Sequence, residues 1–319
     1  MSDSTQALIA LLVEAQRAVK IVGYVTMSSH ALVIADFVHT FPDEVRLMWP
    51  TPLSLPKVLF FIPRYYIFAN NVFWALSMYR TDLTPEECTI DFRRLTLSSQ
   101  MVVLISEAIL FFRVYAFSGE NKKLLVWLVL QFLGLYIGGK VYLLVKYMQS
   151  VKFVQFPFTG MYCIPAEVEH QYLSYVFALL LVNIVVIMGI MMVLAFLKHR
   201  NLKSNLLRVF YRDGIYYFVL LSSFAIANII INAAFSNGGL EYLFINMEVN
   251  LHVILSTRMI LHLRLWAERD SNNGALGSGA AGRFTPGSRP KFLSAIRFKS
   301  RTIDSSLSQG SRGNDIPLN

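Results

Sequence analysis

Charged residues are scarce in this chain, and that scarcity argues against an ordinary soluble fold. Only 15% of the 319 residues are Asp, Glu, Lys or Arg, whereas 55% are hydrophobic. A soluble domain carries about 25% charged residues, because its surface needs a polar skin. A lipid bilayer removes that need, so we predict an integral membrane protein. The net charge of +9 lies mainly in loops and in the C-terminal region, which indicates membrane orientation and no nucleic-acid partner.

Residue patterns that would indicate catalysis are also missing. Only His30, His252 and His262 lie in apolar segments, and none has a second His one helical turn away beside an acid, as a metal hydrolase requires. No phosphate-binding or dinucleotide-binding glycine motif occurs. The last apolar segment has no Lys that could hold retinal as a Schiff base. We therefore expect no enzyme activity, no metal and no cofactor.

Seven apolar segments are long enough to cross a bilayer, which takes roughly 20 residues. The sequence predicts an all-α fold, an integral membrane bundle of seven transmembrane helices over residues 18–265. The expected helices are 18–38, 54–77, 95–117, 124–147, 172–197, 214–235 and 242–265.

The two ends of the chain differ from this bundle. Residues 1–17 form a short N-terminal segment, in which 5–17 can also lie flat on the membrane as an interfacial helix, so six or eight spans also fit. Residues 266–319 are basic, rich in Ser and Gly, and poor in large apolar side chains. Such a segment buries too little surface to offset its ordering entropy, so we predict a disordered cytoplasmic tail.

The distribution of Lys and Arg predicts the orientation, because these residues favour cytoplasmic loops. Loops 39–53, 118–123 and 198–213 hold eight of them, whereas the segments on the opposite side hold five. We therefore expect the N-terminus outside and the C-terminus in the cytoplasm, and we favour the plasma membrane over an endomembrane.

The two cysteines, Cys88 and Cys163, both fall on the side that the charge count places outside. Disulfides persist on the oxidising side of a membrane, so we predict a bridge between them. It would tie the loop between the fourth and fifth helices to the start of the third. Two unpaired cysteines are the alternative. The same placement is a hallmark of G-protein-coupled receptors.

Several ionisable residues lie deep in the predicted helices. A charge in hydrocarbon is costly unless it is paired or faces water. We expect one buried ionic network in which Glu107, the deepest acid, pairs with Arg64 or Arg258. The network has either a static structural role or the role of a latch between helices. Its predicted members are Arg64, Glu107, Arg258, Arg113 and Asp36.

A second polar group lies in the outer half of the predicted bundle and suggests a ligand cavity. Its side chains also suit hydrogen bonds between helices, which is the alternative interpretation. The predicted members are Lys140, Glu248, Asn250, His252, Asn228 and Asn232.

Two runs near the N-terminus, DEVRLMW at 43–49 and SLPKVLF at 54–60 followed by Arg64-Tyr65, carry a resemblance to a known family. Looser matches close the third and seventh helices. Together they resemble multi-pass membrane proteins of mushroom-forming fungi that begin with a domain of unknown function, here about residues 24–68. The resemblance implies a multi-pass membrane fold and no particular activity. The block would act as a cytoplasmic hinge through Asp43, Glu44, Arg46, Trp49 and Lys57.

The architecture as a whole favours a receptor-like seven-helix sensor. Its partners would be the bilayer, an unidentified ligand and a cytoplasmic signalling protein bound through 198–213 and the tail. Receptor motifs are missing, however: the sixth helix has no proline and the seventh no Asn-Pro-x-x-Tyr. A transporter or channel component and a non-signalling membrane scaffold are the alternatives.

Overall fold

A computed structural model describes residues 3–81, 83–119, 121–153, 163, 165–199, 205–234 and 240–277. Within these ranges the chain forms seven long helical rods, which confirms the predicted all-α class. Six rods are α1 (Asp3–Leu47), α2 (Leu55–Tyr79), α3 (Pro85–Ser118), α6 (His170–His199), α7 (Asn205–Ala234) and α8 (Ile245–Gly277). The fourth rod in chain order is continuous and consists of α4 (Lys122–Leu133), the π-helix η1 (Gly134–Lys140) and α5 (Val141–Ser150).

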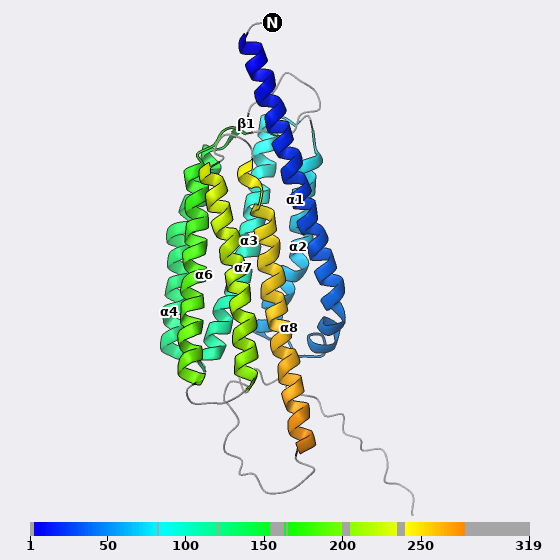
Figure 1. Cartoon of the computed structure of the whole chain (residues 1–319), viewed down its shortest axis with the longest axis vertical. Coiled ribbons are helices and arrows are strands. Elements are labelled where there is room, and N and C mark those ends of the chain that lie inside the picture. The colour runs from blue at the N-terminus through cyan, green and yellow to red at the C-terminus, as the bar shows by residue number, and fades with distance from the viewer. Residues whose placement is uncertain are drawn as a thin grey trace, which may run out of the picture.

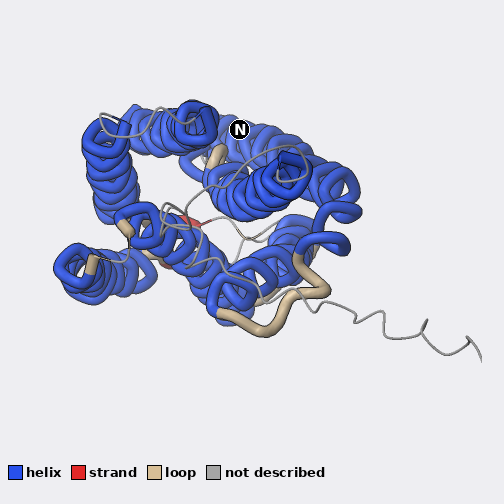
Figure 2. Tube along the Cα trace, turned by 90° about the horizontal axis from the view of Figure 1, so that it is seen from below, coloured by secondary structure: helices blue, strands red, loops and turns tan. Residues whose placement is uncertain are grey.

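The rods lie side by side in a closed ring (Figure 1 and Figure 2). Each rod contacts the next one in chain order, and α8 contacts α1, which closes the ring. Contacts of α8 with α2 and α3, and of α3 with α6, cross the interior. The two helices α3 and α8 therefore form the centre of the bundle.

Five helices are long and apolar enough to cross a membrane in the described part of the chain. They lie in α1, α3, the fourth rod, α6 and α7. Large apolar side chains such as Leu130, Val193 and Phe196 are exposed on their outer faces, as a lipid environment requires. Helices α2 and α8 are not among these five. Their charged residues Arg64 and Glu248 are only 3% and 1% exposed, inside the bundle.

Some helix ends differ from those expected. Helix α1 passes residue 17 without a break, so residues 5–17 continue the first helix and extend beyond the ring (Figure 1). Helix α3 begins at Pro85 because Thr84 and Glu87 form a capping box there. Helix α8 continues to Gly277, so the first part of the region expected to be disordered is helical. Residues 278–319 lie outside the described residues.

One end of the ring carries the N-terminus and the strands β1 (Lys152–Phe153) and β2 (Pro165–Glu167). These strands pair in an antiparallel ribbon. The opposite end carries the connection between α1 and α2 and the last turns of α8. This grouping of the connections is the one that the predicted spans require. We call the two ends the ribbon end and the hairpin end.

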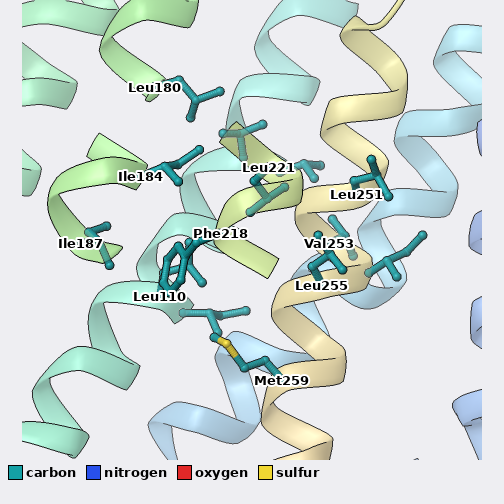
Figure 3. Packing of buried hydrophobic residues seen from close by; sticks show 14 of the residues in the cluster. Leu110, Leu180, Ile184, Ile187, Phe218, Leu221, Leu251, Val253, Leu255 and Met259 are labelled. Carbon is teal, nitrogen blue, oxygen red and sulfur yellow. The ribbon is translucent and has the colours of Figure 1, made fainter. Parts of the chain in front are cut away.

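Apolar side chains fill the space between α3, α6, α7 and α8 (Figure 3). Leu110, Ile184, Phe218 and Leu255 are among them, and all are buried. On α8 this layer lies between two polar residues, Glu248 toward the ribbon end and Arg258 toward the hairpin end. The core therefore separates two polar groups of the bundle.

Candidate functional site

The polar group at the hairpin end is built by α1 and α2. Arg64 donates from Nε to the Glu44 carboxylate at 2.5 Å and from Nη2 to the Thr40 hydroxyl at 2.6 Å. Its Nη1 lies 3.5 Å from the Asp36 carboxylate. The Tyr65 hydroxyl donates to the second oxygen of Glu44 at 2.6 Å. One arginine of α2 thus binds two carboxylates of α1, those of Asp36 and Glu44.

At the hairpin end, helix α8 makes polar contacts with this pair of helices. Arg258 binds the second oxygen of Asp36. Arg264 donates to the Leu47 carbonyl at 2.8 Å, where it binds an orphan acceptor at the end of α1. Farther along, Glu268 accepts from Arg46 at 3.0 Å in an exposed ion pair. The hairpin end therefore joins the first two helices to the last.

The predicted pairing of Glu107 is wrong. Glu107 binds Lys140, whose ammonium lies 2.9 and 3.1 Å from its two oxygens. Arg64 and Arg258 bind Asp36 instead, so the expected single network is two separate groups. Both Glu107 and Lys140 are buried, at 0% and 3% exposure. The fifth predicted member, Arg113, is also buried on α3.

The π-helix η1 places Lys140 beside Glu107. A π segment widens the helix locally and is frequent at functional sites. Tyr136, one turn earlier in η1, sits with its ring 4.5 Å from the Lys140 ammonium. The close approach of η1 to α6 requires Gly139, because a Cβ there would meet Leu179 Cδ1 at 2.8 Å.

A cavity of about 150 Å³ lies between this polar centre and the ribbon end. Lys140 and Glu248 line its floor, and the disulfide residues Cys88 and Cys163 line the ribbon end. Most of the remaining wall is apolar or aromatic. It includes Trp74, Phe92, Leu95, Leu144, Tyr147 and Phe177. An apolar wall with a few convergent polar groups is the usual form of a small-molecule site.

Glu248 is the least satisfied charged group at this cavity. Asn228 on α7 donates to its Oε2 at 2.5 Å. Its Oε1 is buried and has no hydrogen-bond partner among the residues that the structure describes. His252, one turn farther along α8, directs its Nδ1 to the Glu248 carbonyl at 3.0 Å. The carboxylate is thus held in place on one side only.

Four of the six residues predicted for an outer cavity do not line this one, although Asn232 lines a separate pocket beside α6 and α7. Asn250 donates to Ser29 on α1 at 2.8 Å, and so joins α8 to α1. Asn232 donates to the Asn228 carbonyl at 2.9 Å. Asn228 and His252 reach the cavity only through Glu248. These amides and the imidazole act between or along helices, as the alternative interpretation expected.

The predicted hinge block is also partly helical. Asp43, Glu44 and Arg46 lie in the last turns of α1 and not in a loop, because α1 continues through Pro42. The ammonium of Lys57 donates to the carbonyls of Trp49 and Thr51, at 3.1 and 2.7 Å. The block is a rigid helical hairpin whose turn is closed by a lysine.

The disulfide between Cys88 and Cys163 is confirmed. It attaches the segment that follows α5 to the first turn of α3, with the two Cα atoms 5.8 Å apart. The basic loop 198–213 and the tail were the predicted contact with a signalling partner. Side chains 198–214 and residues 278–319 lie outside the described residues.

Sequence reasoning missed several polar residues that complete these groups. Tyr136 looked like any aromatic residue of an apolar helix, and only the π turn directs it toward Lys140. Asn70 on α2 accepts from Ser98 and Ser99 on α3, at 2.8 and 3.2 Å, and joins those helices near the cavity. In the part of the chain that the structure describes, no three His, Cys, Asp or Glu side chains are grouped to hold a metal ion.

Comparison with known proteins gives one match. Residues 24–69 match DUF6533, described as a family of unknown function. The match confirms the predicted domain of unknown function. It covers the second half of α1, the connection to α2 and the first part of α2. Neither the curated proteins nor the solved structures contain a match.

Proposed function

We propose that this multi-pass membrane protein is a receptor-like sensor that binds a small ligand in the cavity at the ribbon end. The proposal places the ribbon end outside the cell, the hairpin end in the cytoplasm, and all seven rods across the plasma membrane. The observation that carries it is α8, a single helix with Glu248 in the cavity and Arg258 in the polar group at the hairpin end.

The lengths of α2 and α8 support seven spans. With a rise of 1.5 Å per residue, their 25 and 33 residues extend about 38 and 50 Å, more than the roughly 30 Å hydrocarbon core. They lie alongside the five apolar helices (Figure 2). Their charges are compatible with a membrane because Arg64, Glu248 and Arg264 are enclosed by other helices.

Two independent features support the orientation. Basic residues are more frequent in the connections of the hairpin end, as cytoplasmic loops require. The disulfide lies at the ribbon end, as an oxidising compartment requires. An odd number of spans then puts the C-terminal region in the cytoplasm.

The mechanism follows from differential binding. A ligand changes a conformational equilibrium only if it binds one state more tightly than the other. A ligand that pulls on Glu248 moves α8 relative to α1, and the contact of Arg258 with Asp36 lies on that same interface. Binding in the cavity would therefore change the hairpin end through α8, without a path for the ligand across the apolar layer.

The test uses the full chain reconstituted in lipid nanodiscs. A probe is added to the cavity at one end of α8, and the position of the other end is measured. Spin labels on Arg46→Cys and Glu268→Cys report the α1–α8 distance at the hairpin end. Benzyl alcohol, a small neutral probe that suits the apolar wall, is added at saturating concentration. We expect the distance distribution to shift, because the labelled positions flank the contact that α8 makes with α1.

A matched pair of variants separates cavity binding from general effects of the probe on the bilayer. Thr96→Phe fills the cavity, whereas Leu97→Phe adds an aromatic ring on the exposed face of the same helix. The shift should vanish in the first variant and persist in the second. Binding without any distance change would overturn the sensor proposal. Uptake of the probe into proteoliposomes, lost in Thr96→Phe, would favour a transporter instead.

A further inference from the structure

Two acidic side chains, Glu107 and Glu248, and one basic side chain, Lys140, meet at the floor of the cavity. Lys140 is fully engaged by Glu107, whose two oxygens it contacts at 2.9 and 3.1 Å. Glu248 lines the same floor, and in the described part of the chain no Lys or Arg forms an ion pair with it. Around it lie Glu107, Lys140, the imidazole of His252 and the Asn228 amide. With Glu107 and Lys140 neutralising each other, one carboxylate remains.

The free side of that carboxylate is Oε1. Asn228 occupies Oε2, and Oε1 has no donor although Glu248 is 99% buried. A buried polar atom without a partner is rare, because the atom has lost its water without gaining a hydrogen bond. Glu248 lines the cavity, so a bound molecule can supply that donor.

The wall of the cavity determines the size and polarity of the rest of the ligand. Aromatic and aliphatic side chains such as Trp74, Phe92 and Phe177 surround the space above the floor. A volume of about 150 Å³ suits a body of roughly one aromatic ring, because a cavity of that size holds benzene in another protein. An anionic ligand would instead face two carboxylates and a lysine that is already paired.

We propose that the ligand is a small lipophilic amine whose protonated nitrogen donates to Oε1 of Glu248 while its apolar body fills the cavity. This inference rests on the proposed ligand site and names its chemical class. The amine supplies the one positive charge that the floor lacks, and its hydrogen bond to the carboxylate is charge-assisted.

The experiment compares three probes with the same ring: benzylamine, benzyl alcohol and benzoate. Each is titrated into the full chain in nanodiscs, and its dissociation constant is taken from the rise in melting temperature with probe concentration. We expect benzylamine to bind more tightly than benzyl alcohol by roughly 10- to 100-fold, the range of a charge-assisted hydrogen bond. Benzoate should bind most weakly.

Glu248→Gln keeps the shape of the side chain and removes its charge. It should abolish the preference for benzylamine. Glu86→Gln, on an exposed turn of α3, is the matched control and should preserve the preference. Cooperative thermal unfolding without any probe shows that Glu248→Gln folds. If Glu248→Gln binds neither probe, Glu248→Asp, which keeps the charge, must retain the amine preference.

The outcomes separate the two proposals. If all three probes bind equally and Thr96→Phe blocks them, the cavity is a ligand site but the amine assignment is wrong. If no probe binds, or if Thr96→Phe does not prevent the binding, the proposal of a ligand site in this cavity is wrong. A preference for the amine that survives Glu248→Gln would overturn the role of Glu248.

Discussion

The guanidinium of Arg64 meets the carboxylate of Glu44 at 2.5 Å, with both side chains buried between α1 and α2. Phe37 and Phe60 lie against the same guanidinium, 5.0 and 5.4 Å from their ring centres. All four residues belong to the segment that matches the family of unknown function. The matched segment is thus a hairpin whose two helices are joined by an enclosed arginine.

Replacing Arg64 should destabilise the protein strongly. Arg64→Met leaves Asp36 and Glu44 with fewer donors, and breaking one side of a buried ion pair costs about 3–5 kcal/mol. The double variant Arg64→Met with Glu44→Gln should recover part of that loss, because it removes one of the stranded charges. Thermal unfolding of the purified chain in detergent measures both values.

Arg46 provides the matched control at the same end of the bundle. Its ion pair with Glu268 is exposed, and exposed pairs contribute about 0–1 kcal/mol. Arg46→Ala should therefore change the unfolding temperature little. Equal losses from Arg46→Ala and Arg64→Met would contradict the structural role of the buried arginine.

Glu107 and Lys140 should behave as one unit. Glu107→Gln strands the Lys140 ammonium in the core, and Lys140→Met strands the carboxylate, so each single variant should lower expression and stability. The double variant should be more stable than either one, with a coupling free energy of about 0.5–3 kcal/mol, the range for contacting residues. Wild-type stability in Glu107→Gln would rule out the structural ion pair.

The disulfide should stabilise the fold in an all-or-none manner. Cys88→Ser, Cys163→Ser and the double variant should lose the same stability, because either change removes the bridge. The bridge closes a loop of 75 residues, for which chain entropy sets an upper bound of about 4 kcal/mol. Unfolding with and without reductant measures the loss. A larger loss in the double variant than in the singles would show that the thiols have separate roles.

The same cysteines test the orientation of the chain. A membrane-impermeant maleimide applied to intact cells should label Cys88 and Cys163 only after reduction. A cysteine introduced at Thr51, at the hairpin end, should stay unlabelled until the membrane is permeabilised. Labelling of the hairpin end in intact cells would reverse the proposed topology.

Two adjacent glycines should respond differently to the same change. A Cβ at Gly139 would meet Leu179 Cδ1 at 2.8 Å, whereas one at Gly138 has no atom within 4 Å. Gly139→Ala should cost about 1–3 kcal/mol, the range for overpacking, unless Leu179 shifts. Gly138→Ala should be neutral or stabilising, because alanine favours helices. Leu179→Ala should restore the stability of Gly139→Ala, as melting temperatures of the three variants would show.

Sequence reasoning was most accurate where the length of an apolar run along the chain determines the structure. The segment expected at 172–197 forms α6 at His170–His199, because a charge-free run of that length has no other stable environment. The disulfide was predicted from the charge of the loops, which determines the compartment of each cysteine. Both inferences need only the position of a residue along the membrane normal.

Predictions about partners within the membrane were less accurate, because they also need the rotation of each helix. Glu107 was paired with arginines at suitable depth, but the π turn brings Lys140 to it instead. Glu44 was placed in the loop 39–53, yet α1 continues through Pro42 to Leu47. Depth can be read from a sequence, whereas the facing direction depends on the packed neighbours.

The π-helix η1 can be regarded as one inserted residue in an otherwise regular helix. Each residue of an α-helix turns the chain by about 100°, and the wider π turn takes up one extra residue without rotating the helix that follows it. Leu128 before η1 and Tyr147 after it both face the bundle interior, which an uninterrupted α-helix with the same number of residues would not ensure. Deleting one residue between Gly134 and Lys140 would turn the rod into a regular α-helix that keeps these two residues on the same face. Such a deletion would thus spare the packing of α4 and α5 and remove the widened turn that places Lys140 beside Glu107.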